Sequence, residues 1–428
     1  MIFYDTLVIV SDTVLQVALE GVIAIGAAFL ILPLLYLLEL ARILPIAMER
    51  PTPALAENEL PHVLVQLPIF NEGNLTTGLL RTVAALDWPK DRLHIQLLDD
   101  STDDTTETAA AEIMRLRRNG FHADHLRRTH RSGFKAGALA AGLAMSEADF
   151  VAMLDADYRP PTDWLRVVIP RFAAYPRAAF IQSRCEFMNS NSNWLTRAQS
   201  LLFDAHFVME QGVRARAGIL FQFNGTGGIW RRAAIEAAGG WSPDSLCEDL
   251  DLTVRAALKD WHGVFVMHPP VAGLVPDQMR HWRVQQRRWA SGFAQIARKL
   301  TWPIWRSHWS VMQKLLAGFL ILYQAIFPVA TLASVAFVVD LVLHRGHLPP
   351  VLLLLEVLAV EIVLVAVGMT LPPYLELHRG GIGRYLRTVV ALPPLILYLS
   401  FANARPIVAA FFGRSEVFKR TPKAVADR

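Results

Sequence analysis

Cysteine is scarce in this chain, with only Cys185 and Cys247 among 428 residues. Two cysteines are too few for a disulfide framework, so the sequence indicates a reducing compartment. The pattern Gly-x-Gly-x-x-Gly is also missing after the first predicted strand, at residues 62–68. Its absence argues against a dinucleotide cofactor, because those glycines let the backbone approach a pyrophosphate.

Charge is absent from the first long apolar segment. Gly21 to Leu38 carries no charged residue and is long enough to cross a bilayer. It lacks the basic start and the small-residue cleavage site of a signal peptide, so we interpret it as a membrane span. Asp5 and Asp12 precede it, whereas Arg42 and Arg50 follow it. This excess of basic residues predicts that the next domain is cytoplasmic, on a bacterial-type inner membrane.

Three further apolar segments lie near the C-terminus, at residues 315–339, about 348–371 and about 388–412. Residues 60–300 have the composition of an ordinary globular protein, although 53% of the whole chain is hydrophobic. We therefore predict a soluble domain inserted between membrane spans. The predicted divisions are a span and linker at 1–50, a cytoplasmic domain ending in an interfacial helix at 51–300, and interfacial and transmembrane helices with a short basic tail at 301–428.

The basic tail leaves the number of spans open. Its charges favour a cytoplasmic C-terminus and come from Arg414, Lys419, Arg420 and Lys423. A cytoplasmic tail requires an even number of spans after the soluble domain, whereas three segments are evident. Either residues 315–343 break near Pro328 and cross twice, or the last segment is irregular at Pro393-Pro394 and Arg405.

Charged residues inside apolar segments usually pair or line a polar path, because charge is costly in a bilayer. Glu356, Glu361 and Arg405 occupy such positions. An ion pair between neighbouring spans and a path for a glycan explain them equally well. Basic residues upstream suit contact with membrane lipid or an anionic substrate, and they are Arg280, Arg283, Arg287, Arg288, Arg298 and Lys299.

The soluble domain begins with two strand–helix pairs. Residues 62–68 and 93–98 are typical of buried strands, and residues 74–85 and 105–118 of the helices that follow them. Strands alternating with helices over short connections predict right-handed crossovers and a mostly parallel, Rossmann-like α/β sheet. A third apolar run, at residues 150–154, ends abruptly in carboxylates.

Acidic side chains follow all three strands. Glu72 follows the first, Asp99 and Asp100 the second, and Asp155 and Asp157 the third. Ligands of open α/β sheets bind beyond the carboxyl ends of the strands, so these residues are predicted to form one site. Two such carboxylates can hold a hard divalent cation, which in turn can hold a diphosphate. An isolated Asp-x-Asp is more often a solvated turn, and the neighbouring acidic strand ends favour the site.

Glycines also mark two segments that suit a ligand. Those around Lys135, in residues 131–139, precede a helix and allow close approach to a phosphate, although the segment is not a Walker A loop. A surface lysine near a helix start is the simpler interpretation of Lys135 taken alone. The glycine-rich residues 222–228 predict a loop where the backbone approaches a ligand.

A helix is predicted from residue 247 to about residue 258, and its first turn carries Glu248 and Asp249. Acids in a first turn are ordinarily explained by the helix dipole. That explanation does not account for their position just downstream of the glycine-rich loop.

One face of a later helix carries Trp282, Gln285, Gln286 and Trp289, at positions i, i+3, i+4 and i+7, with Arg288 beside them. Aromatic and amide side chains suit stacking on a sugar ring and hydrogen bonding to its hydroxyls. Interfacial tryptophans near a membrane are the competing explanation. We favour it for three others, which are Trp302, Trp305 and Trp309.

Taken in order, four of these motifs resemble the D, DxD, (T)ED and QxxRW series of the inverting family 2 glycosyltransferases. They are Asp99-Asp100, Asp155-Ala156-Asp157, Glu248-Asp249 and Gln285-Gln286-Arg287-Arg288-Trp289. Residues 65–72, 99–101 and 223–226 look most like the cellulose synthase-like and mannan (glucomannan) synthase-like branch. The resemblance covers about residues 60–300 and extends into the flanking apolar segments. It implies a GT-A catalytic fold and a nucleotide-sugar donor, UDP-glucose or GDP-mannose.

The resemblance also implies which residues bind the donor. They are Glu72, Asp99, Asp100, Lys135, Asp155, Asp157, Gln285 and Arg288. Asp99 and Asp100 would contact the nucleotide base, and Lys135 would lie near the phosphates. Asp155 and Asp157 would bind the diphosphate through Mg²⁺ or Mn²⁺, with Asp157 ligating the metal.

On the acceptor side, the resemblance implies a different set. Asp249, beside Glu248, would be the general base that deprotonates the acceptor hydroxyl. The acceptor sugar would contact Asn224, Gly225, Thr226 and Trp289. Attack opposite the leaving nucleoside diphosphate inverts the anomeric centre, so an α-linked donor would give a β-glycoside.

The sequence departs from the cellulose synthase pattern at two positions. Cys247 replaces the threonine before the acidic pair, and Asn224 stands where cellulose synthases usually carry cysteine. Asn224 is closer to the mannan-type pattern and argues against glucose as the donor sugar. Residues 413–428 after the last span are too short for a cyclic di-GMP-binding domain, so we expect no such regulation.

Three functions compete at this stage. The leading hypothesis is a processive β-glycan synthase, and the second is a non-processive transferase that acts on a membrane lipid. A catalytically inactive nucleotide-sugar-binding scaffold is the third, and the acidic set argues against it because a scaffold needs no base. The expected partners are the donor, a glycan or lipid acceptor and membrane lipids, with no nucleic acid.

Overall fold

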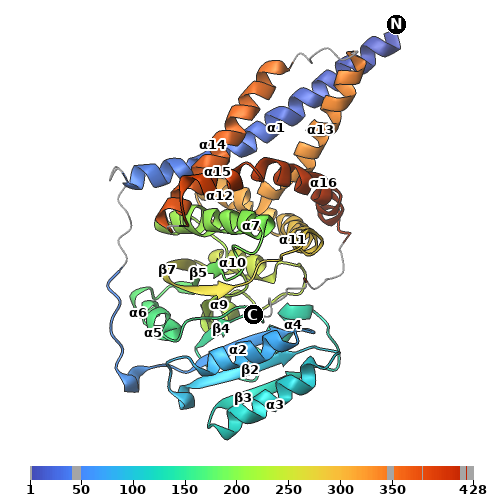
Figure 1. The fold of residues 1–428 in the computed structure, drawn as a ribbon. Coiled ribbons are helices and arrows are strands. Elements are labelled where there is room, and N and C mark those ends of the chain that lie inside the picture. The colour runs from blue at the N-terminus through green and yellow to red at the C-terminus, as the bar shows by residue number, and fades with distance from the viewer. Residues whose placement is uncertain (1, 41–49, 345–350, 378, 415–420, 422–428) are drawn as a thin grey trace.

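The computed structural model describes residues 2–40, 50–344, 351–377, 379–414 and 421. Figure 1 shows an α/β domain at one end of the molecule and a group of long helices projecting from the other. Arg42 and the tail residues Lys419, Arg420 and Lys423 lie outside the described residues. Their predicted effect on orientation therefore stays a prediction.

The α/β domain is built on a seven-stranded sheet in the order β3-β2-β1-β4-β6-β5-β7. The strands are β1 Val63–Ile69, β2 Leu93–Asp99, β3 His122–Arg127, β4 Phe150–Met153, β5 Ala178–Phe187, β6 Gly228–Arg231 and β7 His262–Gly273. β1 pairs in parallel with β2 and β4, β2 with β3, and β5 with β7. Only β6 runs antiparallel to its described neighbours. The predicted mostly parallel α/β sheet is confirmed.

Helices cover both faces of the sheet. They are α2 Asn74–Ala84, α3 Thr105–Arg118, α4 Phe134–Leu143, α5 Trp164–Val168, α6 Arg171–Ala174, α7 Trp194–Asp204, the π-helix η3 Ala205–Gly212, α8 Val213–Arg216, α9 Arg232–Ala237, α10 Glu248–Ala257 and α11 Met279–Arg306. Single-turn 3₁₀ segments lie at η1 Glu57–Glu59, η2 Lys90–Arg92 and η4 Tyr323–Ala325. Val65 of β1 packs on the α2 and α3 side, whereas Leu64 packs on the α4 side. Because both faces are buried, β1 is almost continuously apolar.

The predicted helices at 74–85 and 105–118 are confirmed as α2 and α3. Sequence patterning assigned no element to β3, and the reason is its composition. β3 is an edge strand that reads His-Ala-Asp-His-Leu-Arg and is mostly only partly buried, so it lacks an apolar run. Pairing with β2 holds these residues in an extended strand that their composition does not predict.

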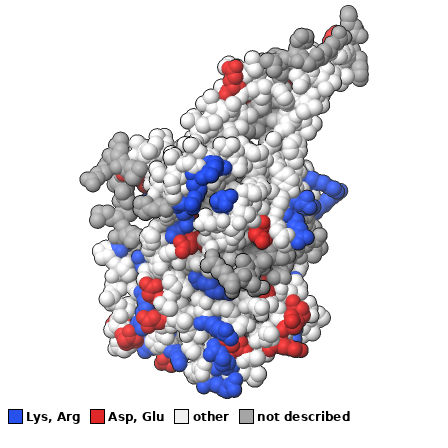
Figure 2. Space-filling view, viewed as in Figure 1, with Lys and Arg blue, Asp and Glu red and all other residues white. Residues whose placement is uncertain are grey.

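Three apolar helices, α1 Ile2–Leu40, α13 Ile326–Leu343 and α14 Leu352–Glu376, project together from the α/β domain (Figure 1). α12 Val311–Leu322, α15 Ile382–Val389 and α16 Leu392–Phe411 lie between them and the α/β domain. By length and composition, four helical segments can cross a membrane, and they are Tyr4–Glu39, Val311–Leu343, Leu352–Glu376 and Ile382–Phe411. On the face in Figure 2 the projecting helices are largely free of charge, and charged side chains gather on the α/β domain.

Two breaks are predicted in the apolar segments, near Pro328 and at Pro393-Pro394, and the structure has both at slightly different positions. Residues 311–343 break at η4, Tyr323–Ala325, ahead of Pro328, which lies within α13. Pro393 and Pro394 lie in the first turn of α16, where a missing N–H costs little. The helix is therefore interrupted between α15 and α16.

One buried acid of the projecting helices lies at a contact between two of them. Glu361 of α14 is buried with its carboxylate against Gly26 of α1, whereas Glu356 and Arg405 are exposed. Within the described part of the chain no ion pair involves any of these three residues. The interpretation that they pair between neighbouring spans is therefore not supported.

Two ion pairs attach the α/β domain to the apolar helices. Arg379, beyond α14, binds Asp204 at the end of α7 at 2.8 Å, and Arg216 of α8 binds Glu39 of α1 at 2.9 Å. Asp204 and Glu39 are both buried. Removing one partner of a buried pair leaves an uncompensated charge, so these contacts hold the two parts in one arrangement.

Candidate active site

A cavity of about 410 Å³ opens at the carboxyl ends of β1, β2 and β4. The loop before β6, the first turn of α10 and one face of α11 complete its wall. The predicted site residues that line it are Glu72, Asp100, Lys135, Asp155, Asp157, Asn224, Gly225, Thr226, Glu248, Asp249, Gln285, Arg288 and Trp289. Residues spread over more than 200 positions of sequence thus share one cavity.

Asp99 is the predicted site residue that lies outside the cavity wall. It is buried, and its carboxylate accepts hydrogen bonds from the Ser101 amide and from His125 Nε2, both at 2.8 Å. Burial raises the pKa of Asp99, but these hydrogen bonds outweigh it and lower the pKa to about 2. Asp99 therefore shapes the loop after β2, and Asp100 is the member of the pair that faces the cavity.

Asp100 is held by a two-pronged ion pair. Arg128 donates from Nε to Oδ1 at 3.0 Å and from Nη2 to Oδ2 at 2.5 Å. Arg131 lies near the same carboxylate, with 3.6 Å between its Nε and Oδ2, and stacks on the Phe70 ring at 3.5 Å. A carboxylate held by arginine keeps lone pairs that can accept hydrogen bonds from a planar base.

Asp155 and Asp157 follow β4 directly, as the sequence predicts. The Asp155 amide donates to Thr226 Oγ1 at 3.0 Å, and Asp157 Oδ2 accepts from the Leu274 amide at 3.2 Å. These bonds fix the turn and keep both side chains at the cavity. Two carboxylates suit Mg²⁺ or Mn²⁺, hard cations that fill their remaining positions with water and phosphate oxygens.

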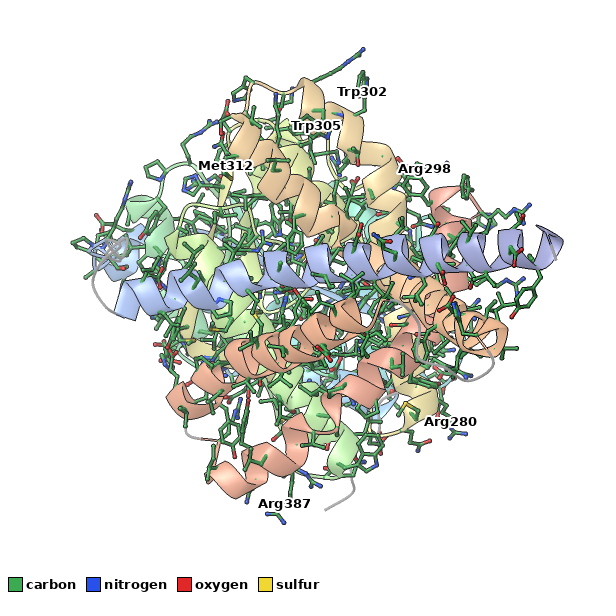
Figure 3. All side chains as sticks on the ribbon, turned by 90° about the horizontal axis from the view of Figure 1, so that it is seen from above. Arg280, Arg298, Trp302, Trp305, Met312 and Arg387 are labelled. Carbon is green, nitrogen blue, oxygen red and sulfur yellow. The ribbon has the colours of Figure 1, made fainter. Side chains whose placement is uncertain are left out.

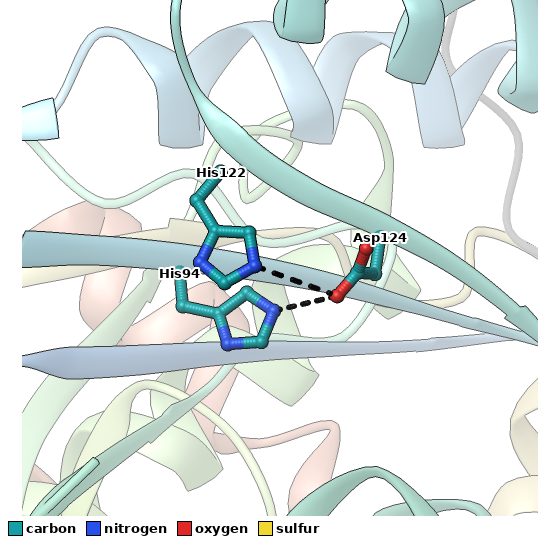
Figure 4. A group of neighbouring side chains, drawn as sticks. All are labelled: His94, His122 and Asp124. Carbon is teal, nitrogen blue, oxygen red and sulfur yellow. Dashed lines mark hydrogen bonds and ion pairs between the residues drawn. The ribbon is translucent and has the colours of Figure 1, made fainter. Parts of the chain in front are cut away.

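Two other clusters of potential metal ligands occur among the described residues, and neither belongs to the cavity. Figure 4 shows His94, His122 and Asp124, with 2.8 Å between His94 Nε2 and Asp124 Oδ2. His94 and His122 lie at the amino ends of β2 and β3, opposite the edge where the cavity opens. The other cluster, Asp12, Asp340 and His344, joins α1 to the end of α13.

Lys135 connects the acidic groups of the cavity. Its Nζ donates to Asp155 Oδ1 at 2.7 Å and to the Gly225 carbonyl at 2.8 Å, and it lies 3.8 Å from Glu248 Oε1. Burial alone would lower the pKa of Lys135, but Asp155, Glu248 and Asp249 raise it, so the ammonium stays charged. The surface-lysine interpretation is therefore wrong.

Asp249 is partly buried, and no ion pair to it occurs among the described residues, whereas Asp251 in the same helix has two cationic partners. Asp251 binds Arg255 at 2.6 Å and Lys299 at 2.8 Å, whereas the Asp249 side chain accepts a hydrogen bond from the Leu250 amide at 2.8 Å. Burial and the adjacent Glu248 raise the pKa of Asp249 to about 7, and Lys135 only partly opposes them. A carboxylate with a pKa near neutrality is suited to general-base catalysis.

Gly225 allows the loop to pass close to Asp249. Its φ is +73°, and a Cβ there would lie 2.8 Å from Asp249 Oδ2 and 3.4 Å from Lys135 Nζ. Glycine at this position lets the base, the lysine and the loop backbone meet.

α11 brings the amide and aromatic residues to the cavity. It packs tightly on the start of α10, where Gly292 contacts Cys247, and this places Gln285, Arg288 and Trp289 beside Asp249 in the cavity wall. Trp289 is partly buried and packs edge-to-face on Phe203, with 6.0 Å between ring centres. Trp282, on the same face, is buried in an apolar cluster with Leu195 and Tyr385, so it contributes to packing more than Trp289 does.

Sequence patterning missed several residues of the cavity wall. They are His206 and Glu210 of η3, Tyr323 and Gln324 of η4, Leu399 of α16, and Thr421. The signal available for His206 and Glu210 was their i, i+4 spacing in an apolar stretch. Tyr323, Gln324 and Leu399 enter the wall because apolar helices pack against the α/β domain, and Thr421 enters it from the tail beyond α16.

Comparison with known proteins agrees with this geometry. The family model for glycosyl transferase family group 2 matches residues 150–369, just over half of the chain. Glucomannan 4-beta-mannosyltransferase 2 of Arabidopsis thaliana is 41% identical over 257 residues, which are 59% of this chain and 48% of that protein. Glucomannan 4-beta-mannosyltransferase 1 of Cyamopsis tetragonoloba is 39% identical over 245 residues, 56% of this chain and 47% of that protein. The chain spans about half the length of the curated relatives it matches.

A solved structure extends the likeness to the fold. It is a mannosyltransferase from Pyrobaculum calidifontis in complex with GDP-Man and Mn²⁺. The two share a TM-score of 0.59 and 20% identity, over 90% of this chain and 99% of that one. Together with the family match, this confirms the predicted GT-A-like fold with flanking apolar helices.

Proposed function

Because this chain belongs to glycosyl transferase family group 2, we propose that it transfers a sugar from a nucleotide-sugar donor to a growing β-linked polysaccharide. We further propose that the sugar is mannose and the product a mannan or glucomannan. The relatives at 38–41% identity are named as glucomannan mannosyltransferases. Asn224 in the acceptor loop supports the same branch.

One observation carries the proposal. Lys135 joins the carboxylate pair after β4 to the loop that passes Asp249, so a diphosphate-binding group and a partly buried base with a pKa of about 7 share one cavity. An inverting sugar transfer needs these two groups on opposite sides of one carbon atom. Neither a lone binding protein nor a scaffold needs the base.

The chemistry follows from this arrangement. Asp249 accepts the proton of the acceptor hydroxyl as its oxygen forms a new bond to C1 of the donor sugar. The bond from C1 to the phosphate oxygen breaks at the same time, and the nucleoside diphosphate leaves. Lys135 and Arg288 balance its negative charge. Attack from the face opposite the leaving group converts an α-linked donor into a β-glycoside.

Asp155 and Asp157 would hold Mg²⁺ or Mn²⁺, which when bound neutralises charge on the departing diphosphate. Asp100 would accept hydrogen bonds from the nucleotide base. Gln285 and Arg288 would contact the diphosphate, and Trp289 would stack on the acceptor sugar.

We also propose that residues 51–300 form the catalytic unit on the cytoplasmic side of a membrane. In this arrangement α13 and α14 cross, while α12, α15 and α16 lie at the interface, so the number of later spans is even. Arg280, Arg298 and Arg387 project outward around the molecule in Figure 3, as do the exposed Trp302, Trp305 and Met312. Basic and aromatic side chains are typical of a membrane interface.

Product analysis tests the function. Purified protein in lipid is incubated with GDP-mannose or UDP-glucose, Mn²⁺ or Mg²⁺, and β-mannan oligosaccharides. We expect mannose incorporation into a water-soluble or insoluble polymer that β-mannanase digests. An organic-soluble product that resists both β-mannanase and β-glucanase would replace this proposal with glycosylation of a lipid.

A further inference from the structure

The cavity wall contains an eight-residue π-helix, η3, which continues directly from α7. π-Helical turns are rare and are frequently found at functional sites. In η3 the wide turn brings Glu210 and Gln211 beside His206. His206 and Glu210 both line the cavity.

Three side chains of this region surround the carbonyl oxygen of Asn224. His206 Nε2 lies 2.9 Å from Asn224 Oδ1, Gln211 Nε2 lies 3.0 Å from it, and Gln222 Nε2 lies 3.2 Å from it. The other ring nitrogen of His206, Nδ1, is 2.7 Å from the Glu210 carboxylate. Glu210 thus fixes the ring, and the ring fixes the amide of Asn224.

The contacts define which way the Asn224 amide faces. Gln211 Nε2 also donates to the backbone carbonyl of Gln222 at 3.0 Å, so this atom must be the nitrogen of that amide. The Asn224 atom that it meets must then be the oxygen. Burial lowers the pKa of His206, but Glu210 raises it more, which favours a ring that donates from both nitrogens.

The amide nitrogen of Asn224 has no hydrogen-bond partner in the described part of the chain and is buried. A buried donor without a partner costs about 1–3 kcal/mol, so a partner is expected when the site is filled. Asn224 lines the cavity immediately before Gly225, which passes Asp249. A molecule bound in the cavity beside Asp249 can therefore supply the partner that this nitrogen lacks.

We propose that His206, Glu210 and Gln211 are positioning residues that hold Asn224 with its amide nitrogen as a donor to an oxygen atom of the acceptor sugar. This network then selects acceptors that present a hydroxyl or ring oxygen at that position. The inference rests on the proposed function and adds a recognition element to its acceptor side. Donor binding is independent of the network.

Asn224→Asp tests the proposal because it keeps the shape but replaces the donor by an acceptor. With mannotetraose as the acceptor, we expect its KM to rise by about 10-fold or more, while the KM for GDP-mannose changes by less than about 2-fold. His206→Gln and Glu210→Gln should raise the acceptor KM in the same direction by smaller factors. His308→Gln is the matched control, since His308 is an exposed histidine paired to Asp260 at 2.9 Å.

A double-mutant cycle separates positioning from a general structural role. If His206 acts through Asn224, His206→Gln adds nothing to the acceptor KM of Asn224→Ala. Monodeoxy mannotetraoses provide a second readout, in which one deoxy position weakens binding to the wild type but not to Asn224→Ala. Additive effects, or an unchanged acceptor KM in Asn224→Asp, would overturn the proposal.

Binding of mannotetraose, followed by tryptophan fluorescence, distinguishes this inference from the proposed function. Binding that depends on Asn224 without transfer would support the network and count against the polymerase activity. Transfer that is insensitive to Asn224 and His206 would do the reverse. Neither binding nor transfer by the wild-type protein would contradict both.

Discussion

The ammonium group of Lys135 lies 2.7 Å from the carboxylate of Asp155. The same nitrogen donates to the Gly225 carbonyl at 2.8 Å, and Gly225 lies beside Asp249. One cation therefore couples the group that would bind the departing diphosphate to the group that would activate the acceptor. This coupling makes the following changes informative.

Asp249→Asn removes the proposed base with little change in volume. We expect kcat to fall by about 10²- to 10⁴-fold, the usual contribution of general-base catalysis, with donor binding retained. Asp244→Asn is the control, because Asp244 is an exposed carboxylate that binds Lys299 at 3.1 Å. Unchanged product formation in Asp249→Asn would contradict the assignment.

The raised pKa of Asp249 also has a stability consequence. A carboxyl whose folded pKa lies above its unfolded value favours folding at low pH, and this contribution is lost as pH rises through the folded value of about 7. Asp249→Asn should therefore raise the melting temperature at pH 8 and have a smaller effect at pH 5. Thermal unfolding of both proteins at the two pH values measures this.

The rate should depend on pH in a direction that Lys135 controls. Because the base must be ionised, kcat/KM should fall below about pH 7, by about tenfold per pH unit. Lys135 lowers the pKa of Asp249. In Lys135→Met the pH below which kcat/KM falls should therefore be higher, and the donor KM should rise. Lys259→Met, at an exposed position, should leave the profile in place. If Lys135→Met does not change the pH at which kcat/KM falls, a group other than Asp249 controls the pH dependence.

Asp157→Ala tests the metal site. We expect Mn²⁺-dependent binding of GDP-mannose to weaken by about 10-fold or more, since loss of groups around a metal site has effects of this size. Titration with GDP-mannose in Mn²⁺ and in EDTA provides the measurement. Asp163→Ala, on an exposed residue before α5, is the control. If Asp157→Ala binds donor normally in Mn²⁺, the carboxylate has no role in holding a metal.

Gly225→Ala should abolish most activity. Gly218→Ala is the control that separates backbone strain from the contact between the new Cβ and Asp249. Both glycines have positive φ, +73° and +66°, but a Cβ at Gly218 meets no atom within 4 Å. Each alanine should lower the free energy of unfolding by about 1 kcal/mol or more. Only Gly225→Ala should also reduce kcat, by about 100-fold, because its Cβ displaces Asp249. Equal activity losses would mean that backbone strain alone is responsible.

The sequence predicted the fold and the acidic residues of the cavity wall for a local reason. Apolar runs of strand length recur between helical stretches, and the residues that follow strands in a parallel sheet meet at one edge. The strand-end positions of Asp100 and Asp155 therefore predict that they lie in one site. It missed β3, whose polar sequence pairs only because β2 lies beside it.

By itself, the sequence determined the family motifs, the parallel sheet and the apolar segments, because each depends on residues that are close together in the chain. The tertiary structure decided that Asp99 supports the loop while Asp100 faces the cavity, and that Asp249 has a pKa of about 7 whereas Asp251 is held by two cations. It also decided that η3 places His206 against Asn224 and that α16 reaches the cavity. Burial and contacts between distant segments set these properties, and neither is a function of local sequence.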